Sequence, residues 1–108
     1  MACRDMEKAE QAEYDIREEV ENADIVLKKL DLSSLASVRQ CAEDIVKEFD
    51  KIDILVNNAG IFWSPMCTTK DGFNIQFGIN HLGSYCFRNF NLKLIYSQFK
   101  VTFFSLFF

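Results

Sequence analysis

The sequence contains no run of 18 apolar residues, no Cys-x-x-Cys pair and one histidine, His81. A membrane-spanning helix needs about 20 consecutive apolar residues, so we expect no span in this chain. A zinc site needs Cys or His ligands at short spacings, so we expect no metal and no disulfide framework. The first ten residues alternate in charge and hold no apolar stretch, so we expect no secretory signal and an intracellular location on the cytoplasmic side.

Positive charge is also scarce. The chain carries 12 Lys and Arg against 16 Asp and Glu, a net charge of −4, without a basic cluster, which argues against a nucleic-acid partner. The balance is uneven along the chain: residues 1–53 hold 8 bases and 15 acids, whereas residues 54–108 hold four bases and one acid. Ten of the 11 phenylalanines follow residue 60. The two parts therefore differ sharply in composition.

The periodicity of apolar residues predicts alternating helices and strands. In 108 residues that are 49% hydrophobic there is enough apolar material for one small core. Apolar residues recur every three or four positions over 5–21 and 33–50, which predicts two amphipathic helices, and a third helix is expected from Phe73. Short apolar runs over 23–30 and 52–56 predict strands, the second buried on both faces of a parallel sheet. This order indicates an α/β fold with a doubly wound sheet.

Four sequence words carry a resemblance to a known family. They are Ala2-Cys3-Arg4-Asp5, Leu30-Asp31-Leu32, Asp53 through Asn57-Asn58-Ala59-Gly60, and Asp71-Gly72-Phe73 through Asn80-His81-Leu82-Gly83. In this order the words resemble the short-chain dehydrogenase/reductase family, most closely its retinol dehydrogenase-like branch, over about residues 1–85. The resemblance implies that residues 1–87 form a partial, Rossmann-type NAD(P)-binding domain.

The resemblance implies NADP as cofactor. Arg4 stands at a strand tip, where a guanidinium can pair with the 2′-phosphate of NADP, or else is a solvated surface residue. Asp31 matches the acid that hydrogen-bonds the adenine amino group, and it would also favour a helix dipole. The segment from Asn57 to Gly60 resembles the one that lines the ribose and the diphosphate. The cofactor-binding residues implied are Arg4, Asp31, Leu32, Asn57, Ala59 and Gly60.

The resemblance also implies a reaction. Asn80 matches the catalytic asparagine of the family, which helps to hold a water in a proton relay to a lysine, while a tyrosine is the acid/base. The implied reaction passes a hydride between the nicotinamide and a small lipophilic alcohol or aldehyde, such as retinol or retinal. We interpret His81 as a packed or surface residue, and the four cysteines as small buried apolar groups.

The sequence departs from the family in its glycines. The four glycines form no Gly-x-Gly-x-x-Gly turn, and the first strand of the family has no counterpart. In the family's strand order, 3-2-1-4-5, the predicted strands 23–30 and 52–56 would be the third and fourth, which are not neighbours. We therefore expect an incomplete sheet, an internal fragment that starts at an internal methionine, no turnover and little cofactor binding by this chain alone.

The end of the chain carries a misleading motif. Residues Tyr96 to Lys100 spell Tyr-x-x-x-Lys, but Tyr96 follows Asn80 by 16 positions, about 24 Å along one helix, too far to share a reacting atom. We interpret residues 88–108 as a divergent, Phe-rich tail. The alternative function is a non-catalytic interaction or assembly protein, because residues 101–108 have the hydrophobicity and low charge of a self-associating strand.

Overall fold

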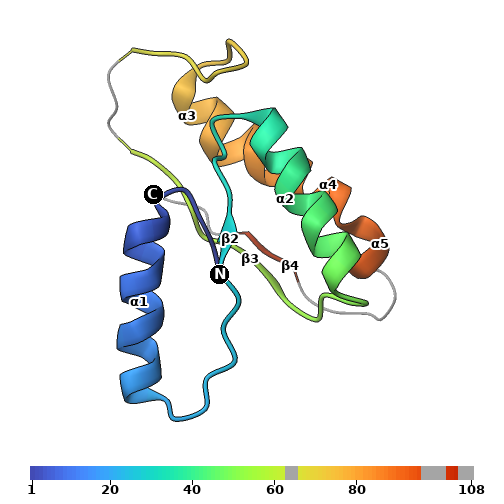
Figure 1. Cartoon of the computed structure of the whole chain (residues 1–108). Coiled ribbons are helices and arrows are strands. Elements are labelled where there is room, and N and C mark those ends of the chain that lie inside the picture. The colour runs from blue at the N-terminus through green and yellow to red at the C-terminus, as the bar shows by residue number, and fades with distance from the viewer. Residues whose placement is uncertain (63–65, 96–101, 105–108) are drawn as a thin grey trace. The chain divides into compact units, whose positions relative to one another are not determined.

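The structure is a computed structural model that describes residues 1–62, 66–95 and 102–104. The chain divides into two compact units, Met1–Asp31 and Leu32–Phe108 (Figure 1). Helices and parallel strands alternate, as the sequence predicts. The described strands form two separate two-stranded sheets.

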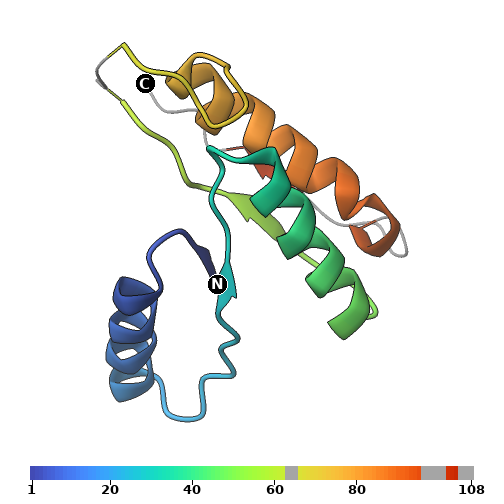
Figure 2. The same cartoon turned by 45° about the horizontal axis from the view of Figure 1, so that its top comes forward.

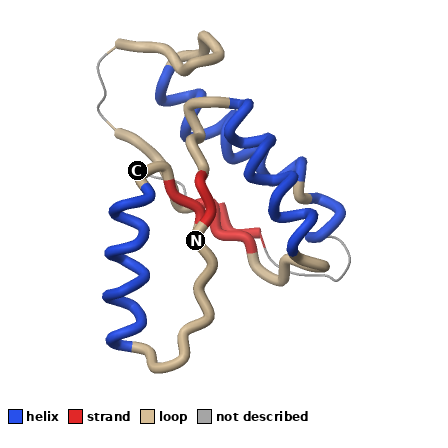
Figure 3. Tube along the Cα trace, viewed as in Figure 1, coloured by secondary structure: helices blue, strands red, loops and turns tan. Residues whose placement is uncertain are grey.

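The first unit is a strand-helix-strand crossover. Strand β1 (Ala2–Cys3) pairs in parallel with β2 (Lys28–Lys29), and helix α1 (Met6–Glu19) connects them (Figure 3). The α1 prediction is confirmed, with Asp5 capping the helix by accepting a hydrogen bond of 3.2 Å from the Lys8 backbone N–H. The predicted strand over 23–30 is wrong in length, because β1 offers a partner to two residues only.

The second unit begins with helix α2 (Leu35–Glu48), which confirms the helix predicted over 33–50. The Ser34 hydroxyl caps it by accepting a 3.4 Å hydrogen bond from the Ser37 backbone N–H. Three residues of α2 are buried: Val38, Cys41 and Ala42. Cys67, by contrast, is exposed, so the interpretation of every cysteine as a buried apolar group is wrong at that position.

The third predicted helix is a composite run. It consists of α3 (Ile75–Phe77), a π-helical segment η1 (Gly78–Gly83) and α4 (Ser84–Phe90), followed by the short α5 (Leu92–Ile95). Helix α4 lies beside α2 in both views (Figures 1 and 2). The buried apolar residues of the run are Ile79, Phe87, Leu94 and Ile95. The core of this unit is therefore built mainly between helices.

The run is interrupted at Asn91, between α4 and α5. Asn91 is fully buried, and its side-chain amide donates a 2.8 Å hydrogen bond to the Phe87 carbonyl. The 24 Å spacing assumed one straight helix from Asn80 to Tyr96, and this break contradicts that premise. The motif Tyr96 to Lys100 itself lies outside the described residues.

Strand β3 (Leu55–Asn57) pairs in parallel with β4 (Thr102–Phe104). Burial of this strand on both faces was predicted, and that prediction is wrong: the side chains of Ile54 and Val56 are 63% and 60% exposed. Leu55, which points to the opposite face, is half-buried, so the unit covers one face of the strand more than the other.

Within the described residues, no helix is both long and apolar enough to cross a membrane.

Candidate functional site

The side chain of Asn80 holds the segment that follows β3. Its Oδ1 accepts a hydrogen bond from the backbone N–H of Ile61, and its Nδ2 donates one to the carbonyl of the same residue, each 2.8 Å long. Ile61 directly follows the predicted cofactor segment Asn57 to Gly60. The amide group thus pairs with Ile61 as a backbone peptide would, and fixes the end of that segment to the π-helical segment.

Gly83 brings the same π-helical segment against Leu32, the residue predicted to contact the cofactor after Asp31. A Cβ atom at Gly83 would lie 2.8 Å from the Leu32 carbonyl oxygen and 2.9 Å from the Leu32 Cβ. Both distances are shorter than van der Waals contact, so only glycine permits this approach. Leu32 is therefore packed on the helical run through its main chain.

Gly78 forms a third close contact, with Thr69. A Cβ atom at Gly78 would lie 2.2 Å from the Thr69 Cγ2 atom. Thr69 belongs to a turn: its backbone N–H donates to the Phe73 carbonyl (2.8 Å), and its Oγ1 accepts from the Phe73 N–H (3.1 Å). Gly72 has φ of +84°, a conformation that favours glycine. The turn therefore fits closely on the helix.

These contacts meet in one short stretch of helix. Gly78, Asn80 and Gly83 all lie in η1, and each holds a different segment of the second unit. π-helical turns within α-helices occur often at functional sites, because they shift side chains away from the positions that a regular helix would give them. We infer that η1 sets the spacing between Leu32 and the end of the Asn57 to Gly60 segment.

Asp71 adds a link that the sequence did not predict. Its Oδ2 accepts a 2.8 Å hydrogen bond from the backbone N–H of Leu35, the first residue of α2, and the neighbouring Lys70 N–H donates to the Ser33 carbonyl (2.9 Å). A carboxylate at a helix N-terminus satisfies a free N–H and favours the dipole. Asp71 thus anchors the turn before α3 to the start of α2.

We predict that Asn80→Asp lowers the free energy of unfolding by about 1–2 kcal/mol. The carboxylate keeps the size of the side chain but places an acceptor against the Ile61 carbonyl, where Nδ2 now donates. Urea denaturation measures the loss, and amide exchange at Ile61 locates it. Asn89→Asp is the control, because Asn89 lies on the same helical run, and it should change stability by less than about 0.5 kcal/mol. Equal effects of the two changes would contradict the assigned role of Asn80.

The Asn57 to Gly60 segment offers groups to a ligand. Ala59 and Gly60 are exposed, while Asn57 is half-buried. The Asn57 Nδ2 atom is buried and has no hydrogen-bond partner among the described residues. An unsatisfied buried donor costs about 1–3 kcal/mol, so it favours a ligand that brings an acceptor oxygen. This orphaned amide fits a ribose or phosphate oxygen.

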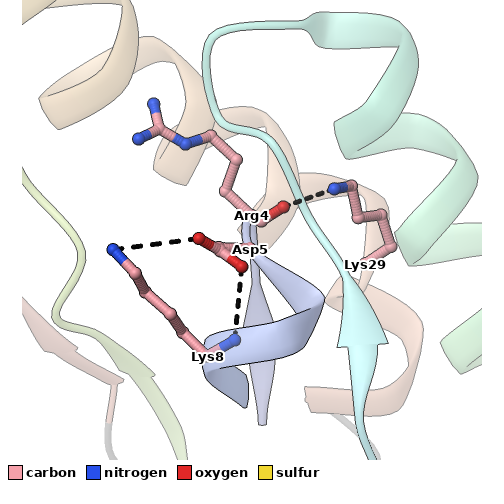
Figure 4. Close-up of polar contacts among 4 residues, drawn as sticks. All are labelled: Arg4, Asp5, Lys8 and Lys29. Carbon is pink, nitrogen blue, oxygen red and sulfur yellow. Dashed lines mark hydrogen bonds and ion pairs between the residues drawn. The ribbon is translucent and has the colours of Figure 1, made fainter. Parts of the chain in front are cut away.

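The first unit contains the two other predicted cofactor residues, Arg4 and Asp31. Arg4 is exposed at the end of β1, and its guanidinium forms no hydrogen bond or ion pair with the described residues (Figure 4). The backbone carbonyl of Arg4 accepts a hydrogen bond from the Lys29 ammonium. Asp31 is buried, 8% exposed. A free guanidinium at a strand end fits a phosphate.

The single histidine lies on the surface of the helical run. His81 is exposed and stacks between Phe77 and Tyr85, with ring centroids 5.3 and 6.1 Å apart. This position agrees with its interpretation as a surface residue.

The sequence did not predict the contacts of Ile61, Asp71 and Lys29, because no local pattern signals a partner that lies 19 to 36 positions away.

Comparison with protein families gives one match that covers the chain. Residues 1–107 match the family described as short chain dehydrogenase. The match extends past residue 87 into the segment expected to be a divergent tail, and the boundary at 87 stays a prediction. The chain is 51% identical over 89 residues to retinol dehydrogenase 13 of Homo sapiens, covering 82% of this chain and 27% of that protein.

Further relatives agree. Retinol dehydrogenase 14 of Mus musculus is 41% identical over 108 residues, which covers 91% of this chain and 32% of that protein. The chain thus spans about a third or less of these relatives. An uncharacterized Mycobacterium paratuberculosis protein of known structure is 37% identical, with a TM-score of 0.73 over 88% of this chain and 32% of that one. An NADP complex of Pseudomonas aeruginosa RhlG is 25% identical, with a TM-score of 0.68 over 86% of this chain and 36% of that one. The expected partial Rossmann-type fold is confirmed.

Proposed function

Because this chain belongs to the short chain dehydrogenase family, we propose that it forms part of the dinucleotide-binding domain of an NADP(H)-dependent oxidoreductase. The observation that carries this proposal is the pairing of Asn80 with Ile61, which fixes the segment after β3 to the helical run. The proposal is also supported by the NADP bound to RhlG, which has the same fold.

The residues of this chain would hold the adenosine half of the cofactor. NADP supplies the nicotinamide that exchanges a hydride with the substrate. Arg4 would pair with the 2′-phosphate, and Asp31 with Leu32 would contact the adenine. The orphaned Asn57 amide would donate to an oxygen of the ribose or the diphosphate, while Ala59 and Gly60 present exposed backbone beside it. These residues would bind and orient the cofactor.

Asn80 contributes to this site as a positioning residue. Both polar atoms of its side chain are engaged with the Ile61 backbone, so the side chain orders the cofactor segment. The catalytic role that the resemblance implies for Asn80, in a proton relay, remains a prediction for the whole protein.

The proposed substrate is a small lipophilic alcohol or aldehyde. This class follows from relatives whose names describe them as retinol dehydrogenases, and of which the chain spans about a third or less. We expect no turnover by these 108 residues alone, because their four glycines form no Gly-x-Gly-x-x-Gly turn to seat the diphosphate. The alternative, an assembly protein that uses residues 88–108, stays a prediction, and the pairing of β4 with β3 places part of that tail in a sheet of the same chain.

Titration of the isotope-labelled chain with NADP⁺ tests the proposal. We expect weak, saturable shifts in the amide resonances of Asn57 to Ile61 and of Arg4, and no oxidation of retinol by the same sample. Arg39→Ala serves as the control, because Arg39 lies on α2 over the Phe90 ring and should leave the shifts unchanged. Absence of shifts at millimolar NADP⁺, in a sample whose circular dichroism shows folded helices, would contradict the proposal.

A further inference from the structure

The side chain of Lys29 lies where the predicted phosphate contact begins. Cys3 and Lys29 are register partners in the β1–β2 ladder, and the Leu30 N–H donates a 2.9 Å hydrogen bond to the Cys3 carbonyl. Arg4 is the first residue beyond this short ladder. The Lys29 ammonium donates to the Arg4 carbonyl and so extends the attachment by one residue (Figure 4). Lys29 therefore holds the backbone from which the Arg4 side chain projects.

The acid that follows Arg4 in the sequence is engaged with another residue. Asp5 accepts a hydrogen bond from the Lys8 backbone N–H (3.2 Å) and forms an ion pair with the Lys8 ammonium (3.8 Å; Figure 4). Asp5 and Lys8 together are neutral. The Arg4 guanidinium is without a partner among the described residues, and the Lys29 ammonium keeps N–H groups beyond the one given to the Arg4 carbonyl.

The unpartnered guanidinium contrasts with its surroundings. Residues 1–53 contain 8 bases and 15 acids, so a cation without a partner among the described residues is unusual there. A phosphate monoester carries about −1.5 to −2 charges at neutral pH, and a guanidinium held in place can pair with its oxygens. A hydroxyl at the same place, as in NAD, would gain little from the guanidinium.

We propose that Lys29 is a second determinant of the preference for a 2′-phosphorylated adenine nucleotide, because it positions the backbone that carries the Arg4 side chain. The inference rests on the proposed function, since it concerns the same cofactor site. It assigns to Lys29 a role that is separate from strand pairing, because the β1–β2 ladder is formed by backbone groups that a change of side chain leaves in place.

The test compares two probes, adenosine 2′,5′-bisphosphate and 5′-AMP, which differ by the 2′-phosphate. Their dissociation constants are measured by titration of the isotope-labelled full chain. For Lys29→Met we expect affinity for the bisphosphate to fall about three- to fivefold, the effect of losing the hydrogen bond that holds the Arg4 backbone, with affinity for 5′-AMP unchanged. Lys29→Arg should restore the preference, because it keeps the charge and can donate to the Arg4 carbonyl.

A second variant, at Asp5, should change the affinity for the bisphosphate in the opposite direction. Asp5→Asn keeps a good helix cap but removes the negative charge of the residue next to Arg4 in the sequence, so the bisphosphate should bind more tightly, by about two- to threefold, while 5′-AMP should not. Circular dichroism of each variant verifies that α1 is intact.

The outcomes separate the inference from the proposed function. A wild-type preference for the bisphosphate that survives Lys29→Met would overturn the inference and leave the proposed function standing. Equal losses for both probes would assign Lys29 a structural role and likewise overturn it. If neither probe shifts the wild-type resonances of Arg4 or of Asn57 to Gly60, the proposed function fails, and the inference fails with it.

Discussion

Replacing Gly83 by alanine is expected to lower the free energy of unfolding of the second unit by about 2–3 kcal/mol. The added methyl would lie 2.8 Å from the Leu32 carbonyl oxygen, a backbone atom that cannot rotate away. Alanine gains up to about 1 kcal/mol of helix propensity over glycine, and we expect the overlap to outweigh that gain. Urea denaturation followed by circular dichroism measures the difference.

A control variant separates the overlap with Leu32 from the general effect of placing alanine in this helical run. Asn89→Ala leaves an alanine at another position of the same helical run, where a Cβ atom is already accommodated, and should change stability by less than about 0.5 kcal/mol. Leu32→Ala combined with Gly83→Ala should not restore stability, because an alanine at residue 32 keeps the carbonyl oxygen and the Cβ atom that the added methyl group would meet. Recovery in that double variant would show that the contact runs through the leucine side chain rather than the backbone.

Gly78→Ala is expected to lower the free energy of unfolding by about 2 kcal/mol, and this loss should be recoverable. The new Cβ would lie 2.2 Å from the Thr69 Cγ2, while the next atom, the Thr69 Cβ, is at an ordinary 3.5 Å. Thr69 is buried, so its methyl group has little room to move.

Thr69→Ser provides the recovery. Serine lacks the Cγ2 atom but keeps the hydroxyl that accepts a hydrogen bond from the Phe73 N–H. We expect the double variant to regain most of the stability lost in Gly78→Ala, with a coupling energy of about 1–2 kcal/mol in the double-mutant cycle. Additive effects would disprove the contact between these two residues.

The helices could be predicted from the sequence, and the strand limits could not. Periodic apolar residues and the caps Asp5 and Ser34 are local signals, so α1 and α2 begin and end within two residues of the predicted limits. A strand extends only as far as its partner does. The run over 23–30 pairs with a two-residue β1, and β3 takes its register from β4, which lies far away in the sequence.

In the candidate site, the sequence predicts the residues but not their contacts. Sequence words identified Arg4, Asn57 and Asn80, because each lies in a short pattern typical of the family. The partners of these residues follow from the fold: the Asn80 amide meets Ile61, and Gly83 meets Leu32, through a π-helical segment that no periodicity predicts. The glycines of the third helix, which weaken its helical propensity, are the residues that allow these contacts.

The two parallel pairs also bear on the order of folding. Each pair closes a loop of chain, residues 4–27 for β1 and β2 and residues 58–101 for β3 and β4. The second loop is nearly twice as long, but a doubling adds only about 0.6 kcal/mol of closure entropy. We expect the helices between β3 and β4 to form before these two strands meet, because contacts within a helix are local whereas the pairing of β3 with β4 is not.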